Sequence, residues 1–114
     1  MLQYVLNRED CVRLCPQPGA VILATEGEKM TLTIMEFEPN LVLPEHSHPH
    51  EQVGYMVEGE AEFIIEGKSQ QVRAGQIWRL PGGVRHQVKV GPRPMRVVET
   101  FYPIREDFRP KDQR

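Results

Sequence analysis

Glycine and proline interrupt this chain so often that few long regular elements fit between them. There are 9 glycines and 10 prolines, and after the first 15 residues the longest stretch without either is Glu28–Glu38. Helices commonly run to about 11 residues, whereas strands of about 5 or 6 are usual. The spacing therefore predicts an all-β sandwich or barrel of roughly nine or ten short strands.

Runs of β-branched, aliphatic and aromatic residues indicate where the strands lie. Ala20–Thr25 and Met30–Glu38 flank a polar segment, Glu26–Lys29, that suits a hairpin turn. For the first 15 residues we expect a strand and a turn at Asn7–Asp10. Further strands are expected at Val53–Val57, Glu60–Ile65, Ser69–Arg73, Val84–Val90 and Met95–Tyr102.

One predicted strand has an outer face that is partly apolar. Leu32 and Ile34 share the alternation of Glu36, so all three should point away from the core. A partly apolar outer face is typical of a surface that another sheet or subunit covers. With Tyr55 and Met56 on a nearby strand, the pattern predicts a homodimer.

The length and charge bound the possible functions. A chain of 114 residues suits a single domain, residues 1–114, and a net charge of −2 favours neither nucleic acid nor membrane as a partner. The charges are unevenly placed: residues 26–66 hold ten acids and one base, and residues 68–114 hold eleven bases and four acids. We expect these runs to form solvated faces that complement each other.

Cys11 and Cys15 are too few for a four-cysteine metal cluster, and their spacing suits a disulfide poorly. We expect free thiols that fill the core, in a reducing compartment. The sequence contains no secretory signal and no apolar run of membrane length, which favours a cytoplasmic protein. Residues 103–114 form a polar tail whose end should fray.

All four histidines lie in two short segments, which suggests a metal site. His46 and His48 are two residues apart, so both rings point to one face of an extended chain. His86 follows a turn that contains two glycines, and Gln52 can face the same place from the next strand. Three imidazoles and one amide oxygen would leave a metal position open for water or substrate. The alternative is that the histidines are only surface residues beside turns.

The spacing of these residues resembles the two cupin motifs. His46-x-His48-x3-Gln52-x6-Gly59 is similar to the first, and Gly75-x5-Pro81-x-Gly83-x2-His86 to the second; both lie within residues 39–90. The resemblance implies a double-stranded β-helix, or jelly-roll barrel. Most cupins carry Glu where this chain has Gln52. A neutral ligand leaves more of the metal charge uncompensated and strengthens its Lewis acidity.

The resemblance also implies one divalent transition metal on His46, His48, Gln52 and His86. An imidazole-rich ligand set suits zinc, nickel, iron, copper or manganese, so the metal stays open. His50 and Glu51 are expected beside the site, without binding the ion.

A third segment, Glu99–Asp107, holds candidate catalytic residues. By alternation Glu99 and Phe101 share a strand face, and Arg105 follows soon after. A guanidinium can hold a carboxylate in a forked pair while a glutamate moves a proton, which suits a small anionic substrate. A final strand with an exposed glutamate and a salt bridge in the tail would give the same spacing.

The same segment resembles the C-terminal part of a small cupin family of pectin and alginate breakdown. The shared pattern is acid-x-Phe-x-Pro-x-Arg-Glu-Asp, with Glu99 where that family has Asp. The resemblance implies a sugar-acid enzyme of lyase or isomerase type, which converts a 4,5-unsaturated uronate to a 4-deoxy-5-keto-uronate. Its catalytic residues would be Glu99, Phe101 and Arg105. An iron-dependent dioxygenase and a non-catalytic small-ligand-binding cupin remain alternatives.

Overall fold

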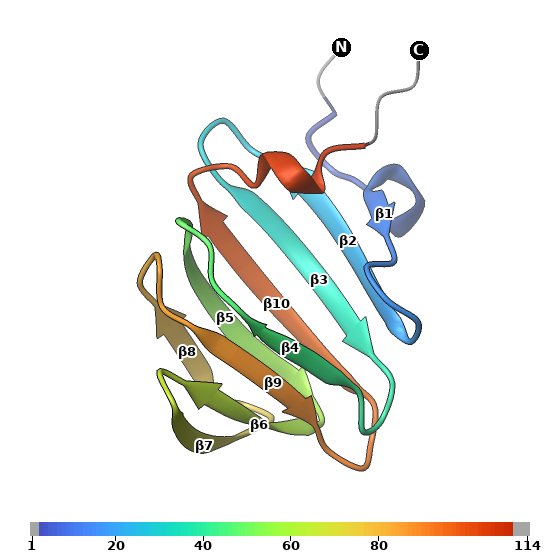
Figure 1. Cartoon of the computed structure of the whole chain (residues 1–114). Coiled ribbons are helices and arrows are strands. Elements are labelled where there is room, and N and C mark those ends of the chain that lie inside the picture. The colour runs from blue at the N-terminus through green and yellow to red at the C-terminus, as the bar shows by residue number, and fades with distance from the viewer. Residues whose placement is uncertain (1–2, 111–114) are drawn as a thin grey trace.

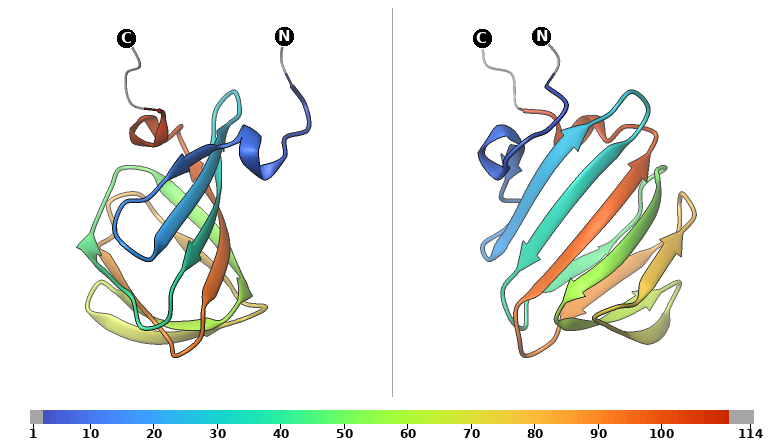
Figure 2. Two further views of the ribbon diagram at one scale, coloured as in Figure 1. Left: turned by 90° about the vertical axis from the view of Figure 1, so that its right-hand side faces the viewer. Right: turned by 180° about the vertical axis from the view of Figure 1, so that it is seen from behind.

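The structure is a computed structural model that describes residues 3–110. Two antiparallel sheets face each other and enclose the core (Figures 1 and 2). The ten strands are β1 (Val12–Leu14), β2 (Ala20–Glu26), β3 (Thr31–Phe37), β4 (Val42–His46), β5 (Glu51–Glu58), β6 (Glu60–Ile65), β7 (Lys68–Arg73), β8 (Ile77–Leu80), β9 (His86–Val90) and β10 (Met95–Tyr102). The all-β jelly-roll prediction is confirmed.

The larger sheet has the order β1-β2-β3-β10-β5-β8, and the smaller has the order β4-β9-β6-β7. Burial alternates along β10, where Met95, Val97, Glu99 and Phe101 are buried and the residues between them are more exposed. This period of two is that of a strand with one face on the core. Because β10 lies between β3 and β5, its inward side chains line the middle of the barrel.

The structure differs from the expected elements mainly at motif segments. The expected turn at Asn7–Asp10 is a short 3-10 helix, η1 (Arg8–Asp10), and the strand of this region, β1, follows it. Strands β4 and β8 lie in the two histidine segments, where none was predicted. Strand β5 also begins earlier than expected, so Gln52 belongs to the sheet.

The expected outer face needs one correction. Leu32 and Tyr55 are exposed, as predicted, and Ile34 is half-buried. Met56, however, has no exposed surface, so its placement on the outer face was wrong. Neighbouring residues of a strand point to opposite faces, and in β5 the face of Met56 is the one on the core.

The two cysteines are free thiols, as predicted, but their predicted place in the core was wrong. Cys11 is half-buried and Cys15 is exposed, so they do not fill the core. Their segment flanks β1, a strand at the edge of the larger sheet. Among residues 3–110 no helix is long and apolar enough to cross a membrane. The end of the polar tail, residues 111–114, lies outside the described residues.

The acidic and basic runs complement each other, as expected. Ion pairs join Arg85 to Glu45 and Arg109 to Glu26. Arg96 contacts both Glu36 and Glu58. These groups are well exposed, and surface pairs of this kind contribute about 0–1 kcal/mol each, so their main effect is on the surface potential rather than on stability.

Candidate metal centre

Three histidines come together at one end of the barrel. His46 and His86 are cross-strand neighbours on β4 and β9, and His48 lies in the loop that follows β4. Their potential ligand atoms all lie within 4.8 Å of one another. His86 is buried, His48 half-buried and His46 exposed, so the cluster faces from the barrel interior toward solvent. The three imidazoles could therefore hold a metal ion.

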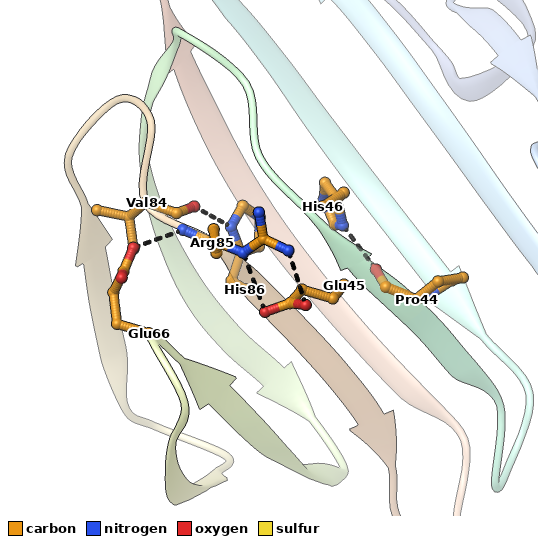
Figure 3. A network of polar contacts seen from close by, with 7 residues as sticks. All are labelled: Pro44, Glu45, His46, Glu66, Val84, Arg85 and His86. Carbon is orange, nitrogen blue, oxygen red and sulfur yellow. Dashed lines mark hydrogen bonds and ion pairs between the residues drawn. The ribbon is translucent and has the colours of Figure 1, made fainter.

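Each imidazole is oriented by a backbone carbonyl from its own segment. The Nδ1–H of His46 donates to Pro44 O at 2.8 Å and that of His86 to Val84 O at 2.8 Å, as Figure 3 shows. His48 donates in the same way to His50 O at 3.0 Å. A carbonyl only accepts, so the proton sits on Nδ1 and the Nε2 lone pair is free. This is the tautomer that a metal ligand needs.

The electrostatics keep two of these rings neutral. Burial, helped by the nearby charge of Arg105, lowers the pKa of His48 to about 4. Burial is also the main reason why the pKa of His86 is lowered. Neutral imidazole is the form that binds metals, so at neutral pH no proton has to leave these rings before an ion can enter.

The two histidine segments are fastened to each other. Gly83 N–H donates to His48 O at 2.7 Å, and a Cβ on Gly82 would collide with Pro49 O. Only glycine at that position lets the two backbones approach so closely. On the outside of β4 and β9, Arg85 forms a forked pair with Glu45 (Figure 3). The turn between β8 and β9 is thereby held against the loop that carries His48.

Gln52 presents an unpaired oxygen in a buried position. Its Nε2–H donates to Glu99 Oε2 at 2.6 Å, while its Oε1 is buried without a hydrogen-bond partner among residues 3–110. A buried polar atom without a partner is costly, and a bound cation would satisfy it. The donor set of three free Nε2 atoms and this oxygen therefore fits a divalent transition metal. His50 packs against His48, with ring centroids 5.6 Å apart, and lies outside the three-histidine cluster.

Glu99 is held on β10 by two hydrogen bonds to one oxygen. Its Oε2 accepts from Gln52 and also from Trp78 Nε1 at 2.7 Å. Trp78 reaches it across β5 because Gly54 lies between them; a Cβ on Gly54 would collide with the indole ring. Only 7% of Glu99 is exposed, so the alternative of an exposed glutamate is wrong. Burial raises its pKa, although both hydrogen bonds and the charge of Arg105 oppose the shift.

Phe101 and Arg105 lie beside the histidines. Phe101 packs edge-on against His48, with centroids 5.8 Å apart. The Arg105 guanidinium carbon lies 4.8 Å from the centre of the Phe101 ring and 4.1 Å from that of Phe108. Arg105 also forms a forked pair with Asp107, so the salt bridge that belonged to the alternative interpretation is present. Asp107 and Phe108 both lie in the short 3-10 helix η2 (Glu106–Phe108).

One cavity of about 310 Å³ inside the barrel is bordered by the clustered histidines and by Gln52, Trp78, Glu99, Phe101, Arg105 and Phe108. The histidines, Gln52, Glu99 and Arg105 form its polar part, while residues such as Phe37, Met95 and Val97 form an apolar floor. This volume is at the lower end for ligand pockets, so it suits a small molecule. A wider hollow of about 860 Å³ on the outside of the sheet contains none of these polar residues.

Two residues of this region escaped the sequence analysis. Trp78 orients Glu99, and the available signal was Gly54, since a glycine inside a strand often marks a close approach. Asp107 belongs to the pattern that suggested Arg105, but nothing in the sequence shows that it pairs with that residue.

Comparisons with known proteins agree with this geometry. Over 87 residues the chain is 24% identical to the pectin degradation protein KdgF of Dickeya dadantii, and the match covers 75% of this chain and 79% of that protein. It is 28% identical over 88 residues to the HTH-type transcriptional regulator PuuR of Escherichia coli, a match that covers 74% of this chain. The chain spans only 48% of the regulator.

A solved structure of KdgF from Halomonas sp. superposes with a TM-score of 0.84 at 22% identity. The match covers 96% of this chain and 100% of that one, so the whole fold is shared. The family model described as "Cupin domain" matches residues 33–101, which include the three clustered histidines, Gln52 and Glu99. The chain therefore belongs to the cupin family.

Proposed function

We propose that this protein is a metal-dependent enzyme that converts a 4,5-unsaturated uronate to the open-chain 4-deoxy-5-keto-uronate. The observation that carries the proposal is the contact between Gln52 and the buried carboxyl of Glu99, an acid beside the histidine cluster. Arg105 borders the same cavity and offers a cation for the substrate carboxylate. The likeness to KdgF proteins supports this choice of substrate.

The metal would be held by Nε2 of His46, His48 and His86 and by Oε1 of Gln52. When bound, it supplies positive charge that stabilises a substrate oxygen as negative charge develops there. The chain supplies the rest. The guanidinium of Arg105 binds the carboxylate and so orients the ring, and Phe101 forms part of the wall that excludes water.

The reaction is an isomerisation that moves one proton. The anomeric hydroxyl loses its proton, the bond between C1 and the ring oxygen breaks, and C4 gains a proton as C5 becomes a ketone. Because its pKa is raised by burial, Glu99 keeps a proton at higher pH than an exposed glutamate. Oε2 already accepts two hydrogen bonds, which leaves Oε1 to give that proton to C4. The carboxylate then takes up the proton that the anomeric hydroxyl loses, so Glu99 ends each turnover as it began.

Ultraviolet absorbance of the conjugated double bond tests the proposal. Protein loaded with zinc, nickel, iron or manganese should speed the loss of absorbance by a 4,5-unsaturated uronate monomer. Glu99→Gln keeps the size and removes the acid, so the rate should fall by about 10²- to 10⁴-fold while the metal content stays unchanged. If the parent protein matched the spontaneous rate with every metal, the uronate proposal would fail.

A second candidate function is a non-catalytic module that binds a small ligand. The match to half of a transcriptional regulator favours it, because in that protein a region like this chain is joined to further sequence. Tight binding of a uronate without turnover would identify such a module. Oxygen consumption during the assay would instead indicate a dioxygenase.

We further propose that a second copy of the chain covers the outer face of the larger sheet. Tyr55 and its cross-strand neighbour Ile77 are 44% and 70% exposed. This apolar centre is bordered by charged residues such as Arg96, the arrangement that subunit interfaces commonly have. Light scattering at micromolar concentration should give a dimer, and Tyr55→Glu should give a monomer. Gln70→Glu, which adds the same charge to the other sheet, should leave a dimer.

A further inference from the structure

Asp107 has no place in the mechanism above, although its contact with Arg105 is closely matched in geometry. Arg105 Nε donates to Asp107 Oδ1 at 2.9 Å and Arg105 Nη2 to Oδ2 at 2.7 Å. The two hydrogen bonds are parallel, which is the forked arrangement in which a guanidinium and a carboxylate bind most strongly. Only 11% of the Arg105 side chain is exposed, against 58% of Asp107.

Two aromatic rings also contact the guanidinium of Arg105. Phe101 and Phe108 both lie within stacking distance of its carbon, on β10 and η2 respectively. Because these two rings are at 87° to each other, they hold the guanidinium carbon in place but do not by themselves stop the group from rotating. The fork with Asp107 stops that rotation. The backbone is also fixed, because Arg105 N–H donates to Thr31 Oγ1 at 2.9 Å.

A guanidinium has five N–H donors, and the fork with Asp107 uses one on Nε and one on Nη2. The remaining three are on Nη1 and on the outer side of Nη2, and together they form a second edge that can also bind a carboxylate. Arg105 borders the cavity together with the clustered histidines and Gln52. The group that Asp107 orients is therefore the one that faces the ligand site.

We propose that Asp107 is a positioning residue, which holds one edge of Arg105 so that the other edge is ready to bind the carboxylate of the ligand. The proposal deepens the proposed function and relies on Arg105 binding a substrate carboxylate. An Arg105 that is fixed in advance loses less side-chain freedom on binding. Asp107 itself is more than half exposed, so its charge contributes little to folding, and its role should appear in ligand binding rather than in stability.

Side-chain nuclear magnetic resonance of the zinc-loaded protein tests the first half. The Arg105 Nε–H should give a slowly exchanging signal in the parent protein and in Glu106→Gln. It should weaken or disappear in Asp107→Asn and return in part in Asp107→Glu. Glu106 lies in the same turn and is exposed, so its variant removes a charge of the same sign without touching the fork. An unchanged signal in Asp107→Asn would overturn the proposal.

Calorimetry with galacturonate, a saturated uronate that cannot undergo the reaction, tests the second half. Asp107→Asn should weaken its binding by roughly 2- to 12-fold, the cost of ordering one long side chain, and Glu106→Gln should not. No binding to the parent protein, or tighter binding to Asp107→Asn, would show that the carboxylate half is wrong. If galacturonate binds as expected but the unsaturated uronate is not converted, the proposed reaction fails and this inference stands.

Discussion

Two walls of the same cavity are built in different ways. On the metal wall, His46, His48 and His86 each donate to a carbonyl two residues away in the chain. Around Glu99, in contrast, the partners are Gln52 and Trp78, which are 47 and 21 residues away. Ligand orientation is thus encoded within a few residues, whereas the acid is placed by tertiary packing.

This difference predicts that changes to the histidines themselves abolish metal binding altogether. The double variant His46→Ala and His48→Ala removes two of about four ligands, so the protein should lose its ion, which elemental analysis should find at about one per chain in the parent. A change beside the ligands typically lowers affinity by only about 10- to 100-fold. His50→Ala should therefore keep the ion at saturating concentration, because its ring lies outside the cluster. Loss of the ion from His50→Ala alone would show that a ligand has been assigned wrongly.

Around Glu99, in contrast, we expect a change in packing to disturb the site. A Cβ on Gly54 would overlap the Trp78 indole, so Gly54→Ala must displace the ring and break its hydrogen bond to Glu99. Urea unfolding should show a loss of about 1–3 kcal/mol, the usual cost of overpacking. Gly27→Ala is the matched control, since its Cβ would approach no atom more closely than 3.5 Å. Equal losses in both variants would mean that the indole adapts.

The smallest expected effect is the one that Glu99 has on how the free energy of unfolding depends on pH. Burial raises the pKa of this carboxyl, so the folded metal-free protein binds its proton more tightly than the unfolded chain does. The free energy of unfolding should fall as pH rises through the pKa that Glu99 has in the folded protein. Above that pKa the full loss of stability is reached. Metal-free Glu99→Gln should therefore exceed the parent in stability at neutral pH, by a margin that shrinks on acidification.

Glu36→Gln is the control of opposite sign for that experiment. The hydrogen bond from Arg8 lowers the pKa of Glu36. Its contribution to the free energy of unfolding is therefore present at neutral pH and lost as pH falls through the folded pKa. A margin for Glu99→Gln that grew with acid, as it would for a paired surface carboxylate, would contradict the burial argument.

What could be predicted from the sequence follows the same division between local contacts and tertiary packing. Most of the strands and the convergence of the histidines could be predicted, because turn residues, alternation and motif spacing are local. Alternation also placed Glu99 and Phe101 on one face of a strand, and in β10 that face is the buried one. Met56 was placed on the wrong face, because the strand boundaries alone did not show which parity of β5 meets the core.

Other features depend on which strands become neighbours. Trp78 reaches Glu99 only because β8 pairs with β5 and β5 with β10, and no periodicity reveals that order. The exposure of Cys15 likewise follows from the position of β1 at the edge of a sheet. Such facts appear only once the chain is folded.

The hydrogen bond between Gln52 and Glu99 also constrains how this cavity can change over evolutionary time. The single change Gln52→Glu would bring two carboxylates to about the 2.6 Å that now separates an amide from its acceptor, in a buried place. Like charges at that distance cannot both ionise. The two carboxyl groups would instead share one proton, so the charge of the cavity and the protonation of the acid would both change in that one step. The exchange Gln52→Glu with Glu99→Gln would reverse donor and acceptor and keep the hydrogen bond without a shared proton.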